Sequence, residues 1–307
     1  MMNIGIFAWF GYTLPMAERA RLIHDAGFHS VMLWMDGSDA VDVPPIRQPD
    51  LFRKHGLKIA NAHLPFERAN DLWNDNADGQ GWYEALAANI ADCGQYDIPA
   101  AVVHPSFGSA PPPPNKVGLD RVKRLVELGE RVGVDIAFEN LRRPDELDCI
   151  FGNIESSRLK FCYDSGHEYV VDRSNRFVEL CERAGVDITF ENLHKPDYFD
   201  SILSRIGIDR KRFCCDGYPD IDLLGKFGDR VSTIHLHDND GTEDQHRMPF
   251  DGAVPWDNIM ARLKKSGYHG DLTLESGAFN ESDASEYSPE EYLAESMKRA
   301  RKLVAMI

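Results

Sequence analysis

C-x-x-C motifs, long apolar runs and runs of basic residues are all missing from this chain of 307 residues. Its six cysteines form no C-x-x-C pair, and a chain of this length needs no disulfide scaffold. No segment approaches the ~20 consecutive apolar residues of a membrane-spanning helix, and residues 1–10 do not resemble a cleavable leader. These absences argue against a secreted disulfide protein and against a membrane protein, and we expect the protein in the cytoplasm.

The charge balance bears on the binding partner. The chain has 50 Asp and Glu residues against 34 Lys and Arg residues, for a formal net charge of −16. Because no cluster of basic side chains offsets it, this acidity disfavours nucleic acid and favours a small-molecule partner. The 43% of hydrophobic residues suffices for a sizeable core in a single domain, 1–307. Formation of a homo-oligomer is left open by the sequence.

Short apolar segments alternate with amphipathic ones along the chain, which predicts a parallel sheet covered by helices. Eight such strands close a (β/α)8, or TIM, barrel. A capping box, Ser288 with Glu291, and Pro289 at the first helical position predict the start of the last helix. The predicted strands are Ile4–Trp9, Ser30–Met35, Leu57–His63, Ala100–His104, Asp135–Asn140, Leu159–Asp164, Val231–His237 and Asp271–Glu275. The other predicted helices are Met16–Ala26, Trp82–Cys93, Val122–Val132 and Trp256–Lys265, and the predicted loops are Asp78–Gly81, Ala110–Asn115 and Asp238–Gly252.

The segments 120–164 and 172–216 are near copies of each other, with an offset of 52 residues. The stretch VELGERVGVDIAFENL returns as VELCERAGVDITFENL, and 25 of the 45 aligned residues are identical. Such agreement indicates a tandem duplication of two strands with their helices, which raises the strand count to ten. Because a wider barrel needs a different shear, tilt and interior, we expect one copy inside an eight-stranded barrel and the other outside it.

The two copies differ just after their second strand. The first continues with a DSGH motif that ends at His167, whereas the second has Pro219 at the corresponding position. The second copy has therefore lost a candidate metal ligand. We predict that the first copy supplies the barrel strands and that about 172–219 is an insertion outside the barrel. The opposite arrangement, with Glu191 and Asp216 in the barrel, stays an alternative.

Six successive predicted strands end in His or carboxylate side chains or are closely followed by them. Such strand ends converge on one point of a barrel, and buried carboxylates there repel unless a cation or a proton lies between them. Mixed imidazole and carboxylate ligands suit Zn, Mn, Co or Fe better than Ca or Mg. We therefore expect a divalent metal, Zn, Mn or Co, at this rim. The candidate residues are His63, His104, Glu139, Asp164, His167, His235, Asp244, His246 and Glu275.

The motifs NAHLPF, VVHPS, AFEN, DSGH, IHLHDND, EDQH and TLES resemble, in their order, those of the xylose isomerase-like TIM barrel superfamily. That superfamily groups sugar and sugar phosphate isomerases and epimerases with endonuclease IV of AP endonuclease family 2. Likeness to the epimerases implies metal ligands at Glu139, Asp164, His235 and Glu275, with His237 as a competitor for the third place. Likeness to endonuclease IV implies three zinc ions and further ligands at His63, His104, His167, Asp244 and His246. The resemblance covers most of the chain, and the duplicated segment is the departure from it.

Two chemistries follow from this resemblance. In a sugar, sugar phosphate or polyol isomerase or epimerase, Glu139 and Glu275 would act as base and acid through an enediolate, and His167 would contact a substrate oxygen. In an endonuclease IV-like phosphodiesterase, zinc ions would generate hydroxide and stabilise the leaving oxygen. Because the loop 238–252 has one Arg among many acidic residues, we predict the isomerase or epimerase with a small sugar or polyol substrate. The predicted substrate-binding residues are His63, His104, His237, Arg247 and Trp9, and Trp34, Phe66 and Trp256 are further aromatic candidates.

A third interpretation is a barrel that the duplication has made catalytically inactive. If the second copy occupied the barrel, Pro219 would stand at the position of His167, and the protein would bind a metal or ligand without turnover.

Overall fold

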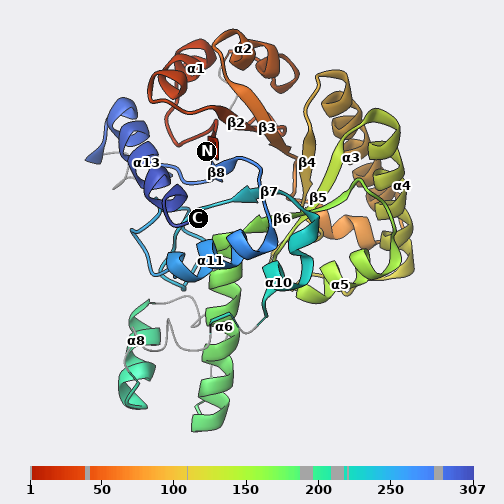
Figure 1. The fold of residues 1–307 in the computed structure, drawn as a ribbon. Coiled ribbons are helices and arrows are strands. Elements are labelled where there is room, and N and C mark those ends of the chain that lie inside the picture. The colour runs from red at the N-terminus through yellow and green to blue at the C-terminus, as the bar shows by residue number, and fades with distance from the viewer. Residues whose placement is uncertain are drawn as a thin grey trace.

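Eight parallel strands form a nearly closed barrel with helices around it, as the predicted (β/α)8 fold requires (Figure 1). The computed structural model describes residues 2–38, 42–108, 110–186, 196–208, 218–219, 221–279 and 286–307. The strands are β1 (Ile4–Phe7), β2 (Ser30–Trp34), β3 (Lys58–His63), β4 (Ala100–Val103), β5 (Asp135–Glu139), β6 (Leu159–Asp164), β7 (Val231–His235) and β8 (Leu272–Leu274).

The sheet follows the order β7-β6-β5-β4-β3-β2-β1-β8, so that each strand pairs with its neighbour in the chain and β1 also pairs with β8. Within the described residues, β7 and β8 meet through one isolated parallel bridge, between Leu236 and Leu274. The Leu236 N–H donates to the Thr273 carbonyl at 2.9 Å, and the Glu275 N–H donates to the Leu236 carbonyl at 3.0 Å. We call this junction the β7–β8 seam.

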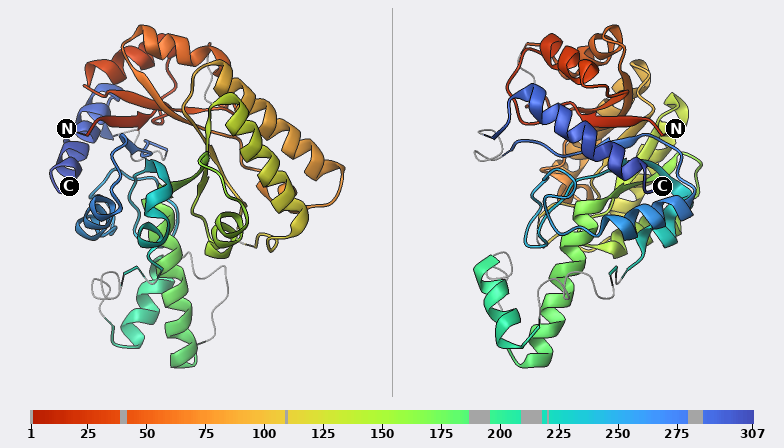
Figure 2. Two further views of the ribbon diagram at one scale, coloured as in Figure 1. Left: turned by 45° about the vertical axis from the view of Figure 1, so that its right-hand side comes forward. Right: turned by 60° about the vertical axis from the view of Figure 1, so that its left-hand side comes forward.

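Helices cover the outside of the barrel (Figures 1 and 2). None of them, in the part of the chain that the structure describes, is both long and apolar enough for a membrane span. They are α1 (Met16–Asp25), α2 (Gln48–Lys54), α3 (Ala77–Gln95), α4 (Lys116–Val132), α5 (Pro144–Asn153), α6 (Ser165–Ala184), α8 (Pro196–Arg205), α10 (Leu223–Phe227), α11 (Trp256–Ser266) and α13 (Pro289–Val304).

Alternation along each strand divides the side chains between two faces. The outward residues of β4, β5 and β6 pack into the main core beneath the helices. The inward residues Val102, Ala137 and Cys162 form a separate buried cluster. The barrel interior is therefore filled, and it forms a floor below the carboxyl ends of the strands.

Most predicted boundaries agree with the structure to within two residues, and the capping box at Ser288 is confirmed. The exceptions are the starts of α3 and α4. The predicted loop at Asp78–Gly81 is wrong, because α3 already begins at Ala77. The Asn76 side chain caps this helix by accepting from the N–H of Gly79 at 2.8 Å. A Cβ at Gly79 would lie 2.2 Å from a backbone oxygen, so this glycine allows close packing rather than flexibility.

The first copy of the duplicated segment supplies β5 and β6 of the barrel. In the second copy, the segments that correspond to these strands, with Glu191 and Asp216, lie outside the described residues. The helix α8 has the bounds of α5 shifted by 52 residues at both ends. Figure 2 shows α6 extending away from the barrel with α8 beside it, and their Phe177 and Phe199 rings lie 4.5 Å apart. That 172–219 forms an insertion outside the barrel stays a prediction.

Candidate metal centre

The structure brings the predicted ligand residues together at the carboxyl end of the barrel. The alternation that turns Ala137 and Cys162 inward also turns Glu139 and Asp164 inward, since they lie two residues further along β5 and β6. The same argument holds for the other strands. The predicted ligands at strand ends or one residue beyond are His63 (β3), His104 (β4), Glu139 (β5), Asp164 (β6), His235 (β7) and Glu275 (β8).

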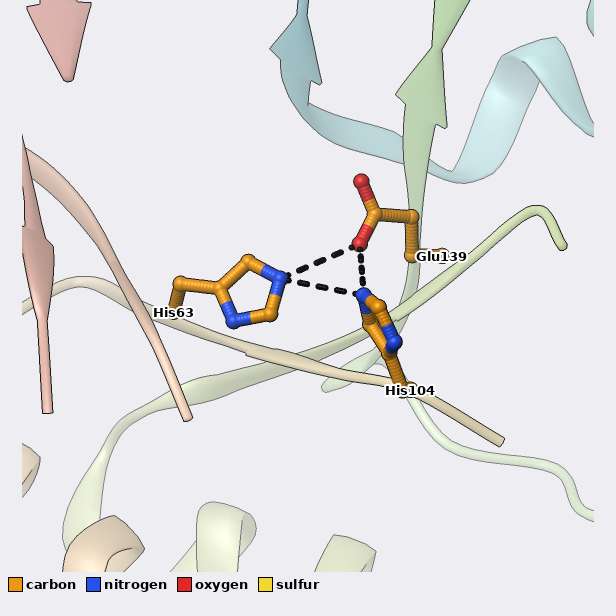
Figure 3. Close-up of side chains that lie close together, drawn as sticks. All are labelled: His63, His104 and Glu139. Carbon is orange, nitrogen blue, oxygen red and sulfur yellow. Dashed lines mark hydrogen bonds and ion pairs between the residues drawn. The ribbon is translucent and has the colours of Figure 1, made fainter. Parts of the chain in front are cut away.

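Glu139 lies at the middle of the centre and is fully buried. Its Oε2 lies 2.8 Å from Nε2 of His104 and 3.3 Å from Nε2 of His63, and these two nitrogens are 3.1 Å apart (Figure 3). The other oxygen, Oε1, lies 2.8 Å from Nδ1 of His235. The carboxylate of Glu139 therefore has one oxygen for each of two adjoining sites.

Four of the residues form the first of these sites. One ligand atom from each of Glu139, Asp164, His235 and Glu275 lies within 4.8 Å of every other. His235 Nδ1 is also 3.3 Å from Oε2 of Glu275. Three carboxylates around one imidazole make a strongly anionic pocket inside the barrel, and it is complementary to a divalent cation.

The second side of the centre is built around Asp244, in the loop after β7. Its Oδ2 lies 3.1 Å from Nε2 of both His167 and His246, and its Oδ1 lies 3.6 Å from Nε2 of His237. His237 in turn lies 3.1 Å from Oδ2 of Asp164. The sequence left His235 and His237 as competitors for one place; in the structure both belong to the cluster, His235 beside Glu139 and His237 beside Asp164.

A glycine makes room for His237. A Cβ at Gly166 would lie 1.9 Å from Cε1 of the His237 ring, a separation that no side chain tolerates. In the preceding turn, Asp164 caps α6 by accepting from the His167 N–H at 2.6 Å. Within four residues, the DSGH motif therefore supplies two candidate ligands, Asp164 and His167, the N-cap of α6 and the space at Gly166 that the His237 ring occupies.

Opposite charges stabilise this buried cluster. Burial raises the pKa of Glu139, but His235, His104 and His63 outweigh it and hold that pKa well below its usual range. Burial lowers the pKa of His235, but Cys162, Glu275 and Glu139 raise it well above its usual range. Protons on imidazoles thus compensate the buried carboxylates. A bound cation would supply the same compensation and release those protons, because metal ligands bind as neutral imidazole and carboxylate.

The residues present fit a divalent metal. The donor set mixes imidazole nitrogen with carboxylate oxygen, as Zn, Mn and Co prefer. In addition, Oε2 of Glu275 is buried in the shared centre, where it has the ion-pair contact with His235 at 3.3 Å but makes no hydrogen bond in the described structure. Two further groups, His63 with His104 and Glu139, and His237 with Asp244 and His246, have the same ligand spacing. His167 joins Asp164 and His237 in a further group.

A cavity of about 470 Å³ adjoins the centre. The predicted residues His63, His104, Trp9, Trp34 and Phe66 all line it. Other predicted residues lie elsewhere. Arg247 does not line the cavity. Its backbone pairs with that of Asp238, and its guanidinium lies 3.8 Å from the Asp240 carboxylate. Trp256 is buried, and its indole N–H donates to Asp238 at 2.9 Å.

Several cavity residues escaped the sequence analysis. Arg142 is the one Lys or Arg residue among the described residues of the lining, and it interacts electrostatically with Asp244. Ser106 lines the cavity and donates a 2.7 Å hydrogen bond to Glu146, whose pKa burial raises to about 7. Both Arg142 and Ser106 follow a predicted ligand by two or three residues, so their position in the strand-end loops was a usable signal. Three phenylalanines, Phe7, Phe107 and Phe279, also line the cavity; Phe107 follows His104 by three residues and shared this signal, whereas Phe7 and Phe279 did not.

Residues 20–303 match the sequence profile described as xylose isomerase-like TIM barrel, and the chain belongs to that family. Among curated relatives, it is 26% identical to the uncharacterised protein y4fM of Sinorhizobium fredii over 171 residues, which span 52% of this chain and about half (52%) of that relative. It is 33% identical to fructoselysine 3-epimerase of Escherichia coli over 57 residues, 19% of this chain and 21% of the relative. Among solved structures, D-psicose 3-epimerase of Clostridium cellulolyticum aligns with a TM-score of 0.68 and 12% identity over 99% of both chains. This last likeness shows the shared fold.

Proposed function

We propose that the protein is a metal-dependent isomerase or epimerase of a sugar, sugar phosphate or polyol. The observation that carries the proposal is the group of Glu139, Asp164, His235 and Glu275, whose ligand atoms lie within 4.8 Å of one another at four successive strand ends. Membership of the xylose isomerase-like family supports it, as do the relatives named as sugar 3-epimerases. The cavity beside this group, about 470 Å³, is of a size that holds a small organic ligand.

The chain supplies both proton-transfer groups of such a reaction. Glu139 and Glu275 come from β5 and from the end of β8; Glu275 lines the cavity, and Glu139 contacts His63 and His104, which line it. Neighbouring histidines hold the pKa values of both carboxyl groups low against the effect of burial, so that either group can serve as the base. One carboxylate would remove the proton next to a carbonyl to give an enediolate, and the opposite carboxyl group, which has to carry a proton for this step, would donate that proton to the other face of the enediolate. A divalent metal, when bound, supplies Lewis-acid stabilisation of the negative charge that develops on the sugar oxygens.

His167 is placed for a different task. Its Nδ1 lies 3.1 Å from the carbonyl oxygen of Asn140, and its Nε2 lies 3.1 Å from Asp244, so the ring is held at both ends. It also lines the cavity. In the proposed reaction it orients a substrate oxygen.

A second candidate function is phosphodiester hydrolysis of the endonuclease IV type. The observation in its favour is the completeness of the ligand set, because the groups around His63 and His104 and around Asp244 and His246 extend the centre on both sides. The net charge of −16 weighs against a nucleic-acid substrate.

Elemental analysis of the purified protein, followed by two activity assays, tests the proposal. We expect a bound Zn, Mn or Co and solvent deuterium incorporation next to the carbonyl of a ketose, followed by NMR. Glu275→Gln should abolish this incorporation, and Glu295→Gln on the outer helix α13 should leave it unchanged. Two or three zinc ions per chain with hydrolysis of bis(p-nitrophenyl) phosphate or abasic DNA would establish the second candidate instead. A metal-loaded protein with neither activity would support the catalytically inactive barrel.

A further inference from the structure

Five aromatic rings form one side of the cavity. Consecutive rings contact each other, with centroids 6.5 Å apart for Phe279 and Phe7, 6.0 Å for Phe7 and Trp34, 5.4 Å for Trp34 and Phe66, and 5.3 Å for Phe66 and Phe107. All five residues line the cavity. We call this row the aromatic wall. It follows β8, β1, β2, β3 and β4 around the rim, whereas the carboxylates Glu139 and Asp164 come from β5 and β6.

The aromatic wall adjoins the metal centre directly. Phe66 stacks on the His104 ring with centroids 4.5 Å apart, and Trp34 lies 5.0 Å from the His63 ring. At the other end, Phe279 lies 5.8 Å from the His246 ring. A ligand held at the centre therefore lies next to the aromatic wall, because the wall contacts three histidines of the centre.

The two ends of the wall are exposed. Among the described residues, four large hydrophobic side chains are exposed, and two of them, Phe107 at 42% and Phe279 at 44%, belong to this wall. The other two, Ile46 at 39% and Ile221 at 44%, do not line the cavity. Exposed aromatic surface that rims a polar centre is a feature of ligand sites rather than of core packing.

We infer that the substrate carries an apolar substituent on its sugar or polyol, and that this substituent packs on the aromatic wall. The inference rests on the proposed function and names the substrate class for the same site. A bare sugar ring can stack on one or two of the five rings and leaves the others in water. An aryl or alkyl group next to the sugar covers Phe107 or Phe279 while the hydroxyl groups stay at the metal centre.

Binding of two pairs of ketose ethers to the metal-loaded protein tests the inference. The probes are 1-O-benzyl- and 6-O-benzyl-D-fructose against the corresponding methyl ethers, and isothermal titration calorimetry gives each Kd. All four probes are neutral and keep the carbonyl, so each pair differs only in apolar surface. We expect at least one benzyl ether to bind about tenfold more tightly than its methyl ether.

Variants locate the preference on the wall. Phe107→Ser and Phe279→Ser should each reduce the benzyl preference, and Phe107→Leu should keep most of it, because it restores apolar surface without a ring. Ile46→Ser and Ile221→Ser are the matched controls of similar exposure and should keep the full preference. Thermal melting and metal content verify that each variant is folded and loaded.

The outcomes separate the inference from the proposed function. Equal Kd values within both ether pairs, with all four ethers bound, would overturn the apolar substituent and leave the sugar reaction standing. A benzyl preference that survives in the Phe107→Ser Phe279→Ser double variant would also overturn it. Failure of all four ethers to bind the metal-loaded protein would count against both the substituent and the sugar substrate.

Discussion

The two copies of the duplicated segment share most of their sequence and have different surroundings. In the first, α5 buries Leu147, Ile150 and Phe151 against the barrel core, and at the same three positions α8 buries Phe199, Ile202 and Leu203. Both helices thus keep the same apolar face. A buried helix face is therefore not what distinguishes the two copies.

What distinguishes them is the residue at each position after the second strand. The first copy has Gly166, which leaves room for the His237 ring, and His167, which contacts Asp244. At the corresponding positions the second copy has Tyr218 and Pro219. Tyr218 instead donates a hydrogen bond of 2.7 Å to Glu168. The comparison teaches that the first copy has space for the His237 ring where the second has a tyrosine, and we predict that this difference decides which copy can complete the centre.

The largest difference between the two copies is expected when the corresponding carboxylates, Glu139 and Glu191, are replaced one at a time and metal affinity and turnover are compared. We expect Glu139→Gln to lower the metal affinity by at least about 100-fold and to abolish turnover, because Glu139 contacts three histidines and belongs to three ligand groups. Glu191→Gln should change neither property. Metal content per chain and a metal titration measure both. Equal losses in the two variants, or a loss only in Glu191→Gln, would contradict the assignment of the first copy to the barrel.

A methyl group at Gly166 should have the next largest effect. Gly166→Ala places its Cβ 1.9 Å from the His237 ring and must displace that ring, so we expect metal affinity to fall by about 10- to 100-fold. Gly152→Ala in α5 is the control, since a Cβ there meets nothing within 4 Å, and it should leave metal binding unchanged. Normal metal binding by Gly166→Ala would show that the clearance is not what the second copy lost.

Glu146 in α5 corresponds to Tyr198 in α8, so the two copies can be compared by how the thermal stability of variants at these positions depends on pH. Burial raises the pKa of Glu146 from 4.5 to about 7. The folded protein therefore holds a costly buried carboxylate at high pH, and stability falls as the pH rises from about 4.5 to about 7. Glu146→Gln should melt a few degrees above the wild type at pH 8 and close to it at pH 5. Tyr198→Phe should shift melting equally at both pH values. A Glu146→Gln shift that does not vary with pH would refute the raised pKa.

Removing the second copy should have the smallest effect on function. With 172–219 replaced by a short Gly-Ser linker, we expect a folded barrel with unchanged metal content and activity within about twofold. A shorter excision, 174–217, keeps the buried Arg173 and the Tyr218 hydrogen bond to Glu168, and it should be more stable by about 1–2 kcal/mol in urea unfolding. An insoluble or molten product from both deletions would argue that the two copies are built into one core.

The barrel and the gathering of His and carboxylate side chains at its rim could be predicted because both follow from local rules. Strand alternation and the end of each apolar run fix which residues, such as Glu139 and Asp164, face the axis at the rim. Of the aromatic wall, Trp34 and Phe66 were candidates from the sequence, whereas Phe7, at the end of β1, and the loop residues Phe107 and Phe279 come to the same cavity only in the closed barrel. Arg247, a predicted substrate-binding residue, is absent from the cavity lining, and its backbone pairing with Asp238 was not evident from the sequence.

At the β7–β8 seam, a cation bound at the rim would affect how readily the barrel opens locally. Its backbone hydrogen bonds are few in the described residues, yet His235 and Glu275 lie at its two sides, 3.3 Å apart. A cation shared by these side chains would join the two strands where the ladder is short. Amide hydrogen exchange at Leu236 and Glu275 should therefore slow as metal is added, while exchange in the long β2–β3 ladder changes little.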